Sequence, residues 1–250
     1  MEKVYFFNSR GEKLTGLLFL GNGQYSLIIC HGFRGSKEGG GRAINLAKKA
    51  QHLGFTTLCF DFSGTGESQG EFASITLGKQ VDDLKSAVDF LFGRTLQPII
   101  LLGRSFGGTT AIIQASQDNR IKGLLTWAAP CLLEETFRKI LLDKYQLLLQ
   151  GCWVEIDDGY STFSLKPNLV KEFSQYNILQ QAAKIAPRPF LILHGEADET
   201  VDVRQASLLY QAAEEPKEVY LLEGANHQFL NHQEEIQGIS LNWLQKYFSS

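Results

Sequence analysis

The sequence lacks the charge surplus and the long apolar runs that mark nucleic-acid-binding and membrane-spanning proteins. Its 24 lysine and arginine residues face 27 aspartate and glutamate residues, which gives a formal net charge of −3. A protein that follows phosphates needs a basic surface, so this balance argues against nucleic-acid binding. The longest apolar stretches, such as residues 99–102, are far shorter than the about 20 residues of a membrane span. The first residues show no signal-peptide pattern. We therefore expect a cytoplasmic protein.

Cysteine is also scarce, and its spacing suggests no metal site. The four cysteines are Cys30, Cys59, Cys131 and Cys152, with neither a CxxC pair nor a Cys/His metal spacing among them. Cys30 and Cys59 fall inside apolar runs, where a free thiol acts as a small core side chain. We expect reduced cysteines, no metal and no organic cofactor.

Proline is limited to six residues, and no Pro/Ser-rich linker or internal repeat divides the chain. Hydrophobic residues make up 44% of the 250 residues, which is ample for a globular core. At about 150 residues per domain, this length allows one domain or two. The order of the expected elements decides between them.

Short apolar runs alternate with helix-spaced segments along most of the chain. The strand-like runs are residues 4–7, 14–20, 26–30, 55–60, 98–102, 121–127, 189–194 and 218–222. The helix-like segments are residues 43–53, 77–92, 105–116, 203–213 and 233–248. Nearly continuous apolar strands are typical of a parallel sheet with helices on both faces. The pattern predicts an α/β fold over residues 1–250, with a mostly parallel eight-stranded sheet and an antiparallel start.

The alternation stops between residues 130 and 185. A long helical stretch, residues 134–149, is followed by two strand-like segments, residues 153–156 and 160–164. Asp157, Asp158 and Gly159 between them predict a hairpin turn. We interpret this region as an insertion into one domain.

A G-x-S-x-G pattern around Ser105 predicts a catalytic nucleophile. The sequence Gly103-Arg104-Ser105-Phe106-Gly107 follows an apolar strand and opens a helical segment, which is the strand–turn–helix context of a nucleophile elbow. Such a tight turn leaves no room for side chains two residues before and after the serine, so glycine is expected there. The amide of Phe106, at the helix start, can donate to a developing oxyanion.

A second match to the pattern, residues 66–70 around Ser68, lacks this context. No helix follows it directly, so Ser68 is expected to be a polar loop residue. The same loop carries glycines spaced like a dinucleotide-binding motif. It does not open a helix after the first strand, so we reject nucleotide binding.

A serine hydroxyl needs a base with a pKa near neutrality and an acid that orients this base. His227 follows the last strand, and Asp198 follows the strand before it. The order Ser105, Asp198, His227 is the one that accompanies a nucleophile elbow, and all three lie beyond carboxyl ends of parallel strands. Asp202 and Glu196 are the alternative acids. Among the other histidines, His31 and His194 also end strands, whereas His52 and His232 are expected at the surface.

A second oxyanion donor is expected from the loop after residues 26–30. This loop reads His31-Gly32-Phe33-Arg34-Gly35. Gly32 allows a close backbone approach, which leaves the amide of Phe33 free to point at a substrate oxygen.

These motifs make the chain resemble the α/β-hydrolase superfamily over essentially its whole length. The matching segments are His31-Gly32-Phe33, residues 61–68 (DFSGTGES), residues 103–108 (GRSFGG), residues 194–198 (HGEAD) and Asn226-His227. The chain looks like the bacterial cinnamoyl/feruloyl-esterase-like and monoglyceride-lipase-like branch. This resemblance implies that residues 130–185 form a cap over an acyl pocket, and that substrates are carboxylic esters of small alcohols.

Arg104 departs from that pattern, because these esterases often carry His or Asn before the nucleophile. A buried guanidinium needs a carboxylate partner, and Asp61 and Glu67 are the candidates. Alternatively, Arg34 or Arg104 faces the cavity and favours an acidic substrate. The cap aromatics Trp153, Tyr160 and Phe163 are candidate contacts for an aryl acyl group, although aromatic residues in a hairpin more often only pack.

The sequence thus predicts a serine carboxylester hydrolase, with Ser105, Asp198 and His227 as its triad and the amides of Phe33 and Phe106 as its oxyanion hole. A serine aminopeptidase, a thioesterase or a monoacylglycerol lipase on the same triad stays open. So does a non-catalytic ligand-binding protein, because fold does not fix function. The expected partner is a small-molecule ester. The oligomeric state is open, with a homodimer as one option.

Overall fold

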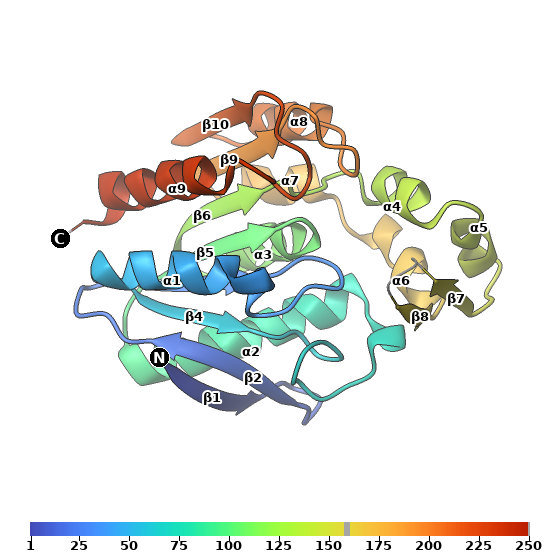
Figure 1. Ribbon diagram of the computed structural model, residues 1–250, viewed down its shortest axis with the longest axis horizontal. Helices are drawn as coiled ribbons and strands as arrows, with labels where there is room; N and C mark the ends of the chain where they lie inside the picture. Colours follow the sequence, from blue (N-terminus) through green and yellow to red (C-terminus); the bar gives the residue numbers. More distant parts are fainter. Residues whose placement is uncertain (158–160, 250) are drawn as a thin grey trace.

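In the computed structural model, which describes residues 1–157 and 161–249, an eight-stranded sheet runs through the centre of the molecule (Figure 1). The strands lie in the order β1-β2-β4-β3-β5-β6-β9-β10. Their bounds are β1 Glu2–Phe7, β2 Lys13–Phe19, β3 Ser26–Cys30, β4 Thr56–Phe60, β5 Ile99–Arg104, β6 Ile121–Trp127, β9 Phe190–Gly195 and β10 Lys217–Leu222. Only β1–β2 and β2–β4 pair antiparallel among these neighbours. The expected mostly parallel sheet with an antiparallel start is confirmed.

Helices cover both faces of this sheet (Figure 1). Helices α1 (Arg42–His52) and α9 (Gln233–Phe248) pack on one face, and α2 (Leu77–Thr95), α3 (Phe106–Gln117), α7 (Ile178–Ala183) and α8 (Arg204–Ala212) lie on the other. Two hydrophobic cores result, one on each side. Every residue of β3 and β4 is buried, which is why these strands read as unbroken apolar runs.

The chain between β6 and β9 holds the elements that lie beyond the carboxyl ends of the strands. They are α4 (Leu133–Leu141), α5 (Asp143–Leu149), β7 (Val154–Asp157), β8 (Thr162–Leu165), α6 (Asn168–Lys171) and the 3₁₀ turn η3 (Phe173–Gln175). Strands β7 and β8 pair antiparallel, as the predicted hairpin requires. Asp158, Gly159 and Tyr160, which include part of the predicted turn and one candidate substrate contact, lie outside the described residues. Two further 3₁₀ turns are η1 (Gly39–Gly41) and η2 (Phe72–Ser74).

The prediction of one helix over residues 134–149 is wrong. Leu142 has a φ of +51° and separates α4 from α5. Phe137, Leu141 and Tyr145 are buried at a spacing of four residues, which is also the spacing of one unbroken helix. The apolar stripe therefore conceals the break.

Candidate active site

Ser105 occupies a strained turn between β5 and α3. Its φ of +51° and ψ of −127° lie outside the regions that residues with a Cβ normally adopt. The amide of Ser105 donates to the carbonyl of Trp127 at 2.8 Å, which ties the turn to the neighbouring strand. The strain is held by the packed sheet, as is common for residues at functional sites.

The flanking glycines are required by the space around the turn. A Cβ on Gly103 would overlap the carbonyl oxygen of Gly107, and a Cβ on Gly107 would overlap that of His31. Gly32 also approaches the serine closely, because its Cβ would lie 3.0 Å from that of Ser105. The elbow and the loop after β3 are therefore packed backbone to backbone.

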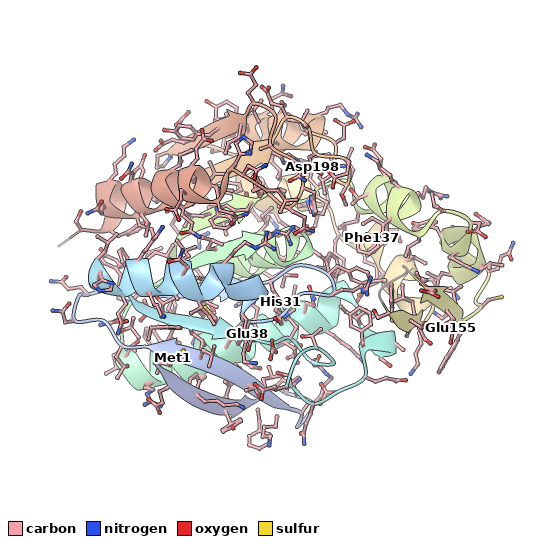
Figure 2. All side chains as sticks on the ribbon, viewed as in Figure 1. Met1, His31, Glu38, Phe137, Glu155 and Asp198 are labelled. Carbon is pink, nitrogen blue, oxygen red and sulfur yellow. The ribbon has the colours of Figure 1, made fainter. Side chains whose placement is uncertain are left out.

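The structure brings Ser105, His227 and Asp198 together, although they come from three different loops. His227 Nε2 lies 3.1 Å from Ser105 Oγ, and His227 Nδ1 lies 2.8 Å from Asp198 Oδ2. Because the carboxylate accepts from Nδ1, Nε2 is left as an acceptor for the serine hydroxyl. Asp198 lies at the carboxyl edge of the sheet, in the loop after β9 (Figure 2).

Asp198 is held as a carboxylate by a closed set of donors. Its Oδ1 accepts from the amides of Thr200 and Val201, each at 2.8 Å, and its Oδ2 lies 3.2 Å from His194 Nε2. Burial raises the pKa of Asp198, but hydrogen bonds from His194 and His227, the charge of His227 and the Val201 amide outweigh it, so this pKa lies below its usual range.

His194 was not expected to serve the acid. Its Nε2 faces two acceptors, the Val201 carbonyl at 3.0 Å and the Asp198 carboxylate, and it therefore carries the proton. The alternative acid Asp202 instead accepts from the amide of Arg204, at the start of α8. The sequence feature that could have indicated this contact is the position of His194 at the end of a strand, four residues before Asp198.

Two backbone amides near Ser105 lack acceptors among the described residues. Phe106 is the first residue of α3, so its amide has no partner within the helix. The amide of Phe33 donates to no described group. Both belong to the segments expected to supply an oxyanion hole.

His31 fixes the loop that carries Phe33. Its Nε2 accepts from the Phe62 amide at 3.2 Å, so its Nδ1 donates to the Gly32 carbonyl at 2.8 Å. Burial lowers the pKa of His31, which keeps the ring neutral. Its donation holds the Gly32 carbonyl turned toward the His31 ring.

Ser68 is bound to the backbone, as its loop position predicts. Its hydroxyl donates to the Asp61 carbonyl at 2.7 Å and accepts from the Thr15 amide at 2.9 Å. His227 lies against Ser105 instead. The second G-x-S-x-G match is thus part of a turn that joins β2 to the loop after β4.

The prediction that Asp61 or Glu67 pairs with Arg104 is wrong. Asp61 pairs with the buried Lys37 at 2.8 Å, and Glu67 pairs with Lys3 and Lys37. Arg104 instead donates to the carbonyl of His227 at 3.1 Å and to the side chain of Gln228 at 3.0 Å. Its side chain points to the face of the sheet covered by α1 and α9, because residues alternate along β5.

On the opposite side of the elbow, phenylalanine rings fill the space between the sheet and the inserted segment. The ring of Phe33 lies 5.4 Å from those of Phe72 and Phe137 and 6.2 Å from that of Phe163. Phe106 and Phe173 extend the group through Phe137, which Figure 2 places between the sheet and the insertion. We call these six residues the phenylalanine cluster.

Arg34 and Trp153, the other two described candidates for substrate contacts, lie in different surroundings. The guanidinium of Arg34 lies 4.1 Å from the Phe163 ring centroid and donates to Ser161 at 2.7 Å, so it joins the Phe33 loop to β8. Trp153 is 64% exposed and stacks with Lys166, outside the phenylalanine cluster.

Neither a metal site nor a membrane span emerges from the part of the chain that the structure describes. No group of three or more His, Cys, Asp or Glu side chains is placed to hold a metal ion. No described helix combines the length and apolarity needed to cross a bilayer. All four cysteines are free thiols.

Together the sheet topology and the helices on its two faces define the α/β-hydrolase fold. The profile of the serine aminopeptidase S33 family (Hydrolase_4) matches residues 22–175 and 157–234, and the chain belongs to this family.

Individual relatives extend the comparison. YfhR of Escherichia coli O157:H7 is 25% identical over 235 residues, which cover 90% of this chain and 73% of that protein. The serine hydrolase BPHL of Mus musculus is 26% identical over 251 residues, covering 90% and 81%. The structure of Est1E from Butyrivibrio proteoclasticus with ferulic acid superposes with a TM-score of 0.82 at 21% identity, covering 99% and 100%. At this identity, the likeness to Est1E concerns the fold alone.

Proposed function

We propose that this hydrolase cleaves carboxylic esters through an acyl-enzyme on Ser105. The observation that carries the proposal is the chain of contacts from Ser105 Oγ through His227 to Asp198, at 3.1 Å and 2.8 Å. Beside it lie two amides for which no described residue provides an acceptor. This is the geometry that serine hydrolysis needs.

The reaction follows from these contacts. Ser105 Oγ attacks the ester carbonyl carbon while its proton passes to His227 Nε2, and the amides of Phe33 and Phe106 donate to the resulting oxyanion. Asp198 stabilises the imidazolium. His227 then protonates the leaving alcohol as the C–O bond breaks. Water attacks the acyl-enzyme with His227 as base, which releases the carboxylic acid and restores the serine hydroxyl.

The phenylalanine cluster favours a short or aryl acyl group. Phe106 and Phe137 are each about 1% exposed, whereas Phe33 and Phe163 are only partly buried and can give way. Aromatic rings that meet edge to face offer the same contact to an aryl acyl chain. The complex of Est1E with ferulic acid, on the same fold, agrees with this preference. We take the insertion to be a cap over Ser105 that meets the acyl group through this cluster.

The family description keeps a serine aminopeptidase as the second candidate. An exopeptidase needs free acidic groups to hold the substrate's amino terminus. On α4, Glu135 pairs with Arg204 at 2.7 Å, and Glu134 lies 3.9 Å from Arg138. These pairings favour an ester over a peptide as the substrate. They do not discriminate between an ester of a small alcohol, a thioester and a monoacylglycerol.

Turnover of an ester panel by matched serine variants tests the proposal. The panel is p-nitrophenyl acetate, butyrate and palmitate with methyl ferulate, beside an aminoacyl p-nitroanilide and a butyryl thioester. We expect acetate, butyrate or ferulate to be cleaved best, and Ser105→Ala to lower kcat by roughly 10⁴-fold or more. Ser68→Ala is the control and retains turnover.

Other outcomes would favour another function. Cleavage of the anilide alone would favour the aminopeptidase, and a steep preference for palmitate would favour the lipase. A clean protein that turns over nothing would favour a binding protein.

A further inference from the structure

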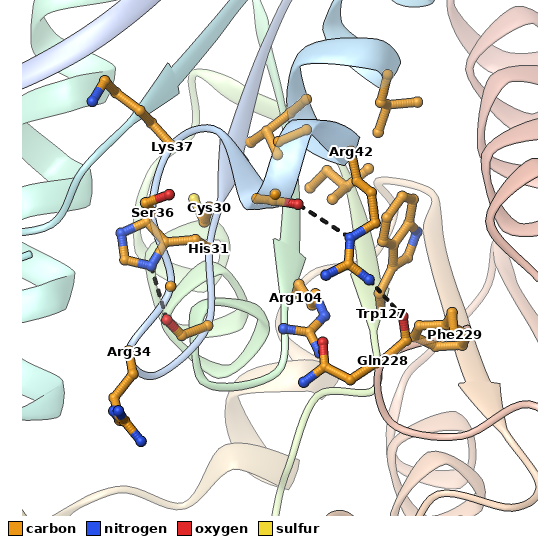
Figure 3. A pocket seen from close by; sticks show the side chains of 18 of the residues that line it. Cys30, His31, Arg34, Ser36, Lys37, Arg42, Arg104, Trp127, Gln228 and Phe229 are labelled. Carbon is orange, nitrogen blue, oxygen red and sulfur yellow. Dashed lines mark hydrogen bonds between the residues drawn. The ribbon is translucent and has the colours of Figure 1, made fainter. Parts of the chain in front are cut away.

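A pocket of about 530 Å³ lies between β5, α1 and the start of α9, and Phe33 of the phenylalanine cluster is also among its lining residues (Figure 3). Its apolar wall includes Leu46, Leu102, Trp127 and Phe229. None of the side chains of Ser105, Asp198 and His227 is among the described residues that line it. Gly32 and Phe33, which belong to the expected oxyanion hole, also line it, so the pocket adjoins the site of the proposed reaction.

Positive charge dominates this pocket. Arg34, Lys37, Arg42 and Arg104 line it, and within residues 1–157 and 161–249 the lining includes no aspartate or glutamate. Lys37 is neutralised by Asp61 and Glu67, and Arg34 is engaged with β8. Arg42 and Arg104 make no ion pair with any described residue.

The acceptors of these two guanidiniums are all uncharged. Arg42 donates to the carbonyls of Gly39 and Gln228 at 3.1 Å and 3.0 Å. Arg104 uses one nitrogen for the His227 carbonyl and the Gln228 side chain. Figure 3 shows both guanidiniums turned toward the same space, beside Trp127. Each keeps further N–H donors, since a guanidinium has five.

Two half-buried cations without an anion between them are unfavourable. Burial lowers the pKa of Arg104 to about 10, and the nearby charge of Arg42 adds to this effect, which the charges of Asp198 and Glu199 offset only in part. An anion placed between the two guanidiniums would offset both contributions. The amino end of α1, an 11-residue helix that begins at Arg42, adds a partial positive charge at the same place.

We infer that this pocket binds an organic carboxylate with an apolar body, held between Arg42 and Arg104 with its body against Trp127 and Leu102. A carboxylate suits the planar fork of arginine, and the apolar wall favours a ligand with a hydrocarbon part over inorganic phosphate. Because Arg104 also donates to the His227 carbonyl, a ligand held by Arg104 is linked through this side chain to the loop that carries the proposed base. This inference does not depend on ester cleavage.

Calorimetric titration of the Ser105→Ala protein with 3-phenylpropionate tests the inference without relying on activity. We expect a dissociation constant below about 1 mM. The neutral isostere 3-phenylpropionamide and inorganic phosphate are the matched ligands, and both should bind at least about tenfold more weakly. Equal binding of the amide would show that no charge is recognised. Tighter binding of phosphate would contradict the apolar body. Either result, or no binding of the carboxylate, overturns the inference.

Variants of the two arginines locate the bound carboxylate. In the Ser105→Ala background, Arg42→Gln and Arg104→Gln should each weaken 3-phenylpropionate binding about tenfold or more, and Arg104→Lys should weaken it less. Lys48→Gln, which removes one charge from an exposed position of the same helix, should have no effect. Arg42 lies at a helix start, so its variant is expected to fold, and the unfolding temperature verifies this. Binding that survives both glutamine variants would place the ligand in the acyl pocket and overturn the inference.

Discussion

Single residues of the candidate active site are positioned by backbone groups as much as by one another. The amides of Thr200 and Val201 hold one oxygen of Asp198 while His227 and His194 take the other. Ser105 is held in its strained turn by the Trp127 carbonyl. The side chains therefore meet in a fixed geometry before any substrate arrives, as catalysis by preorganisation requires.

Asp198 makes the stability of the folded protein depend on pH in the acidic range. Its pKa is lowered in the folded protein, so the unfolded chain takes up a proton first as the pH falls below about 4. The stability that this carboxylate contributes is complete above that pH and is lost as the pH falls through the folded pKa. Asp198→Asn cannot titrate there. We expect the difference in unfolding free energy between wild type and Asp198→Asn, from urea titrations, to shrink between pH 6 and pH 3. A difference that is independent of pH would contradict this assignment.

The second prediction concerns the glycines of the elbow. Gly107→Ala forces a methyl group against the His31 carbonyl and should lower the unfolding free energy by about 3 kcal/mol. Gly93, within α2, has no atom within 4 Å of a Cβ. Gly93→Ala should therefore raise the same free energy by about 0.5–1 kcal/mol. Urea unfolding of the two variants measures both effects, and equal effects would show that the elbow is not tightly packed.

Among the helices and strands, the hydrophobic periodicity predicted the elements whose faces are buried. It did not predict a break in a helix that the local backbone conformation causes. Strands β3 and β5 were predictable because both of their faces are covered. The break at Leu142 was not, because the buried stripe continues from Leu141 to Tyr145 across it. The sequence carries no glycine or proline there to mark the turn.

The break at Leu142 yields the prediction at this scale. Leu142 is 72% exposed and has a positive φ, so Leu142→Gly loses little packing and relieves a conformation that is unfavourable for a side chain. We expect its unfolding free energy to rise by up to about 1 kcal/mol. Leu147→Gly, in the helical part of α5, should lower it by about 1 kcal/mol. Thermal or urea unfolding distinguishes them, and destabilisation by both would refute the strain at Leu142.

At the scale of the whole molecule, the sheet and the insertion share one hydrophobic core. Phe137 and Leu148 of the insertion belong to the same buried cluster as Leu101 of β5. We therefore predict that the insertion unfolds together with the sheet, in one transition. Phe137→Ala should lower the unfolding free energy by about 3–5 kcal/mol while far-UV and near-UV circular dichroism still report the same midpoint. A separate early transition would mean that the insertion is an independent unit.

The arrangement of the site was predictable to the extent that topology creates it. Ser105, Asp198 and His227 all follow strands of one parallel sheet, whose carboxyl ends lie at the same edge. The partners of Arg104 were not predictable, because the side to which a residue points depends on the register of β5 within the sheet. The pocket between Arg42 and Arg104 depends on how α1 packs on the face of the sheet to which Arg104 points, and no local pattern encodes this packing.

Labelling of the native protein with a fluorophosphonate, followed by intact mass and peptide mapping, shows whether Ser105 is the nucleophile. A serine activated by His227 attacks the phosphorus, whereas an ordinary hydroxyl does not. We predict one adduct per chain, on the peptide that contains Ser105, and none after Ser105→Ala or His227→Ala. An unmodified protein, or an adduct on Ser68, would contradict the claim that Ser105 is the nucleophile.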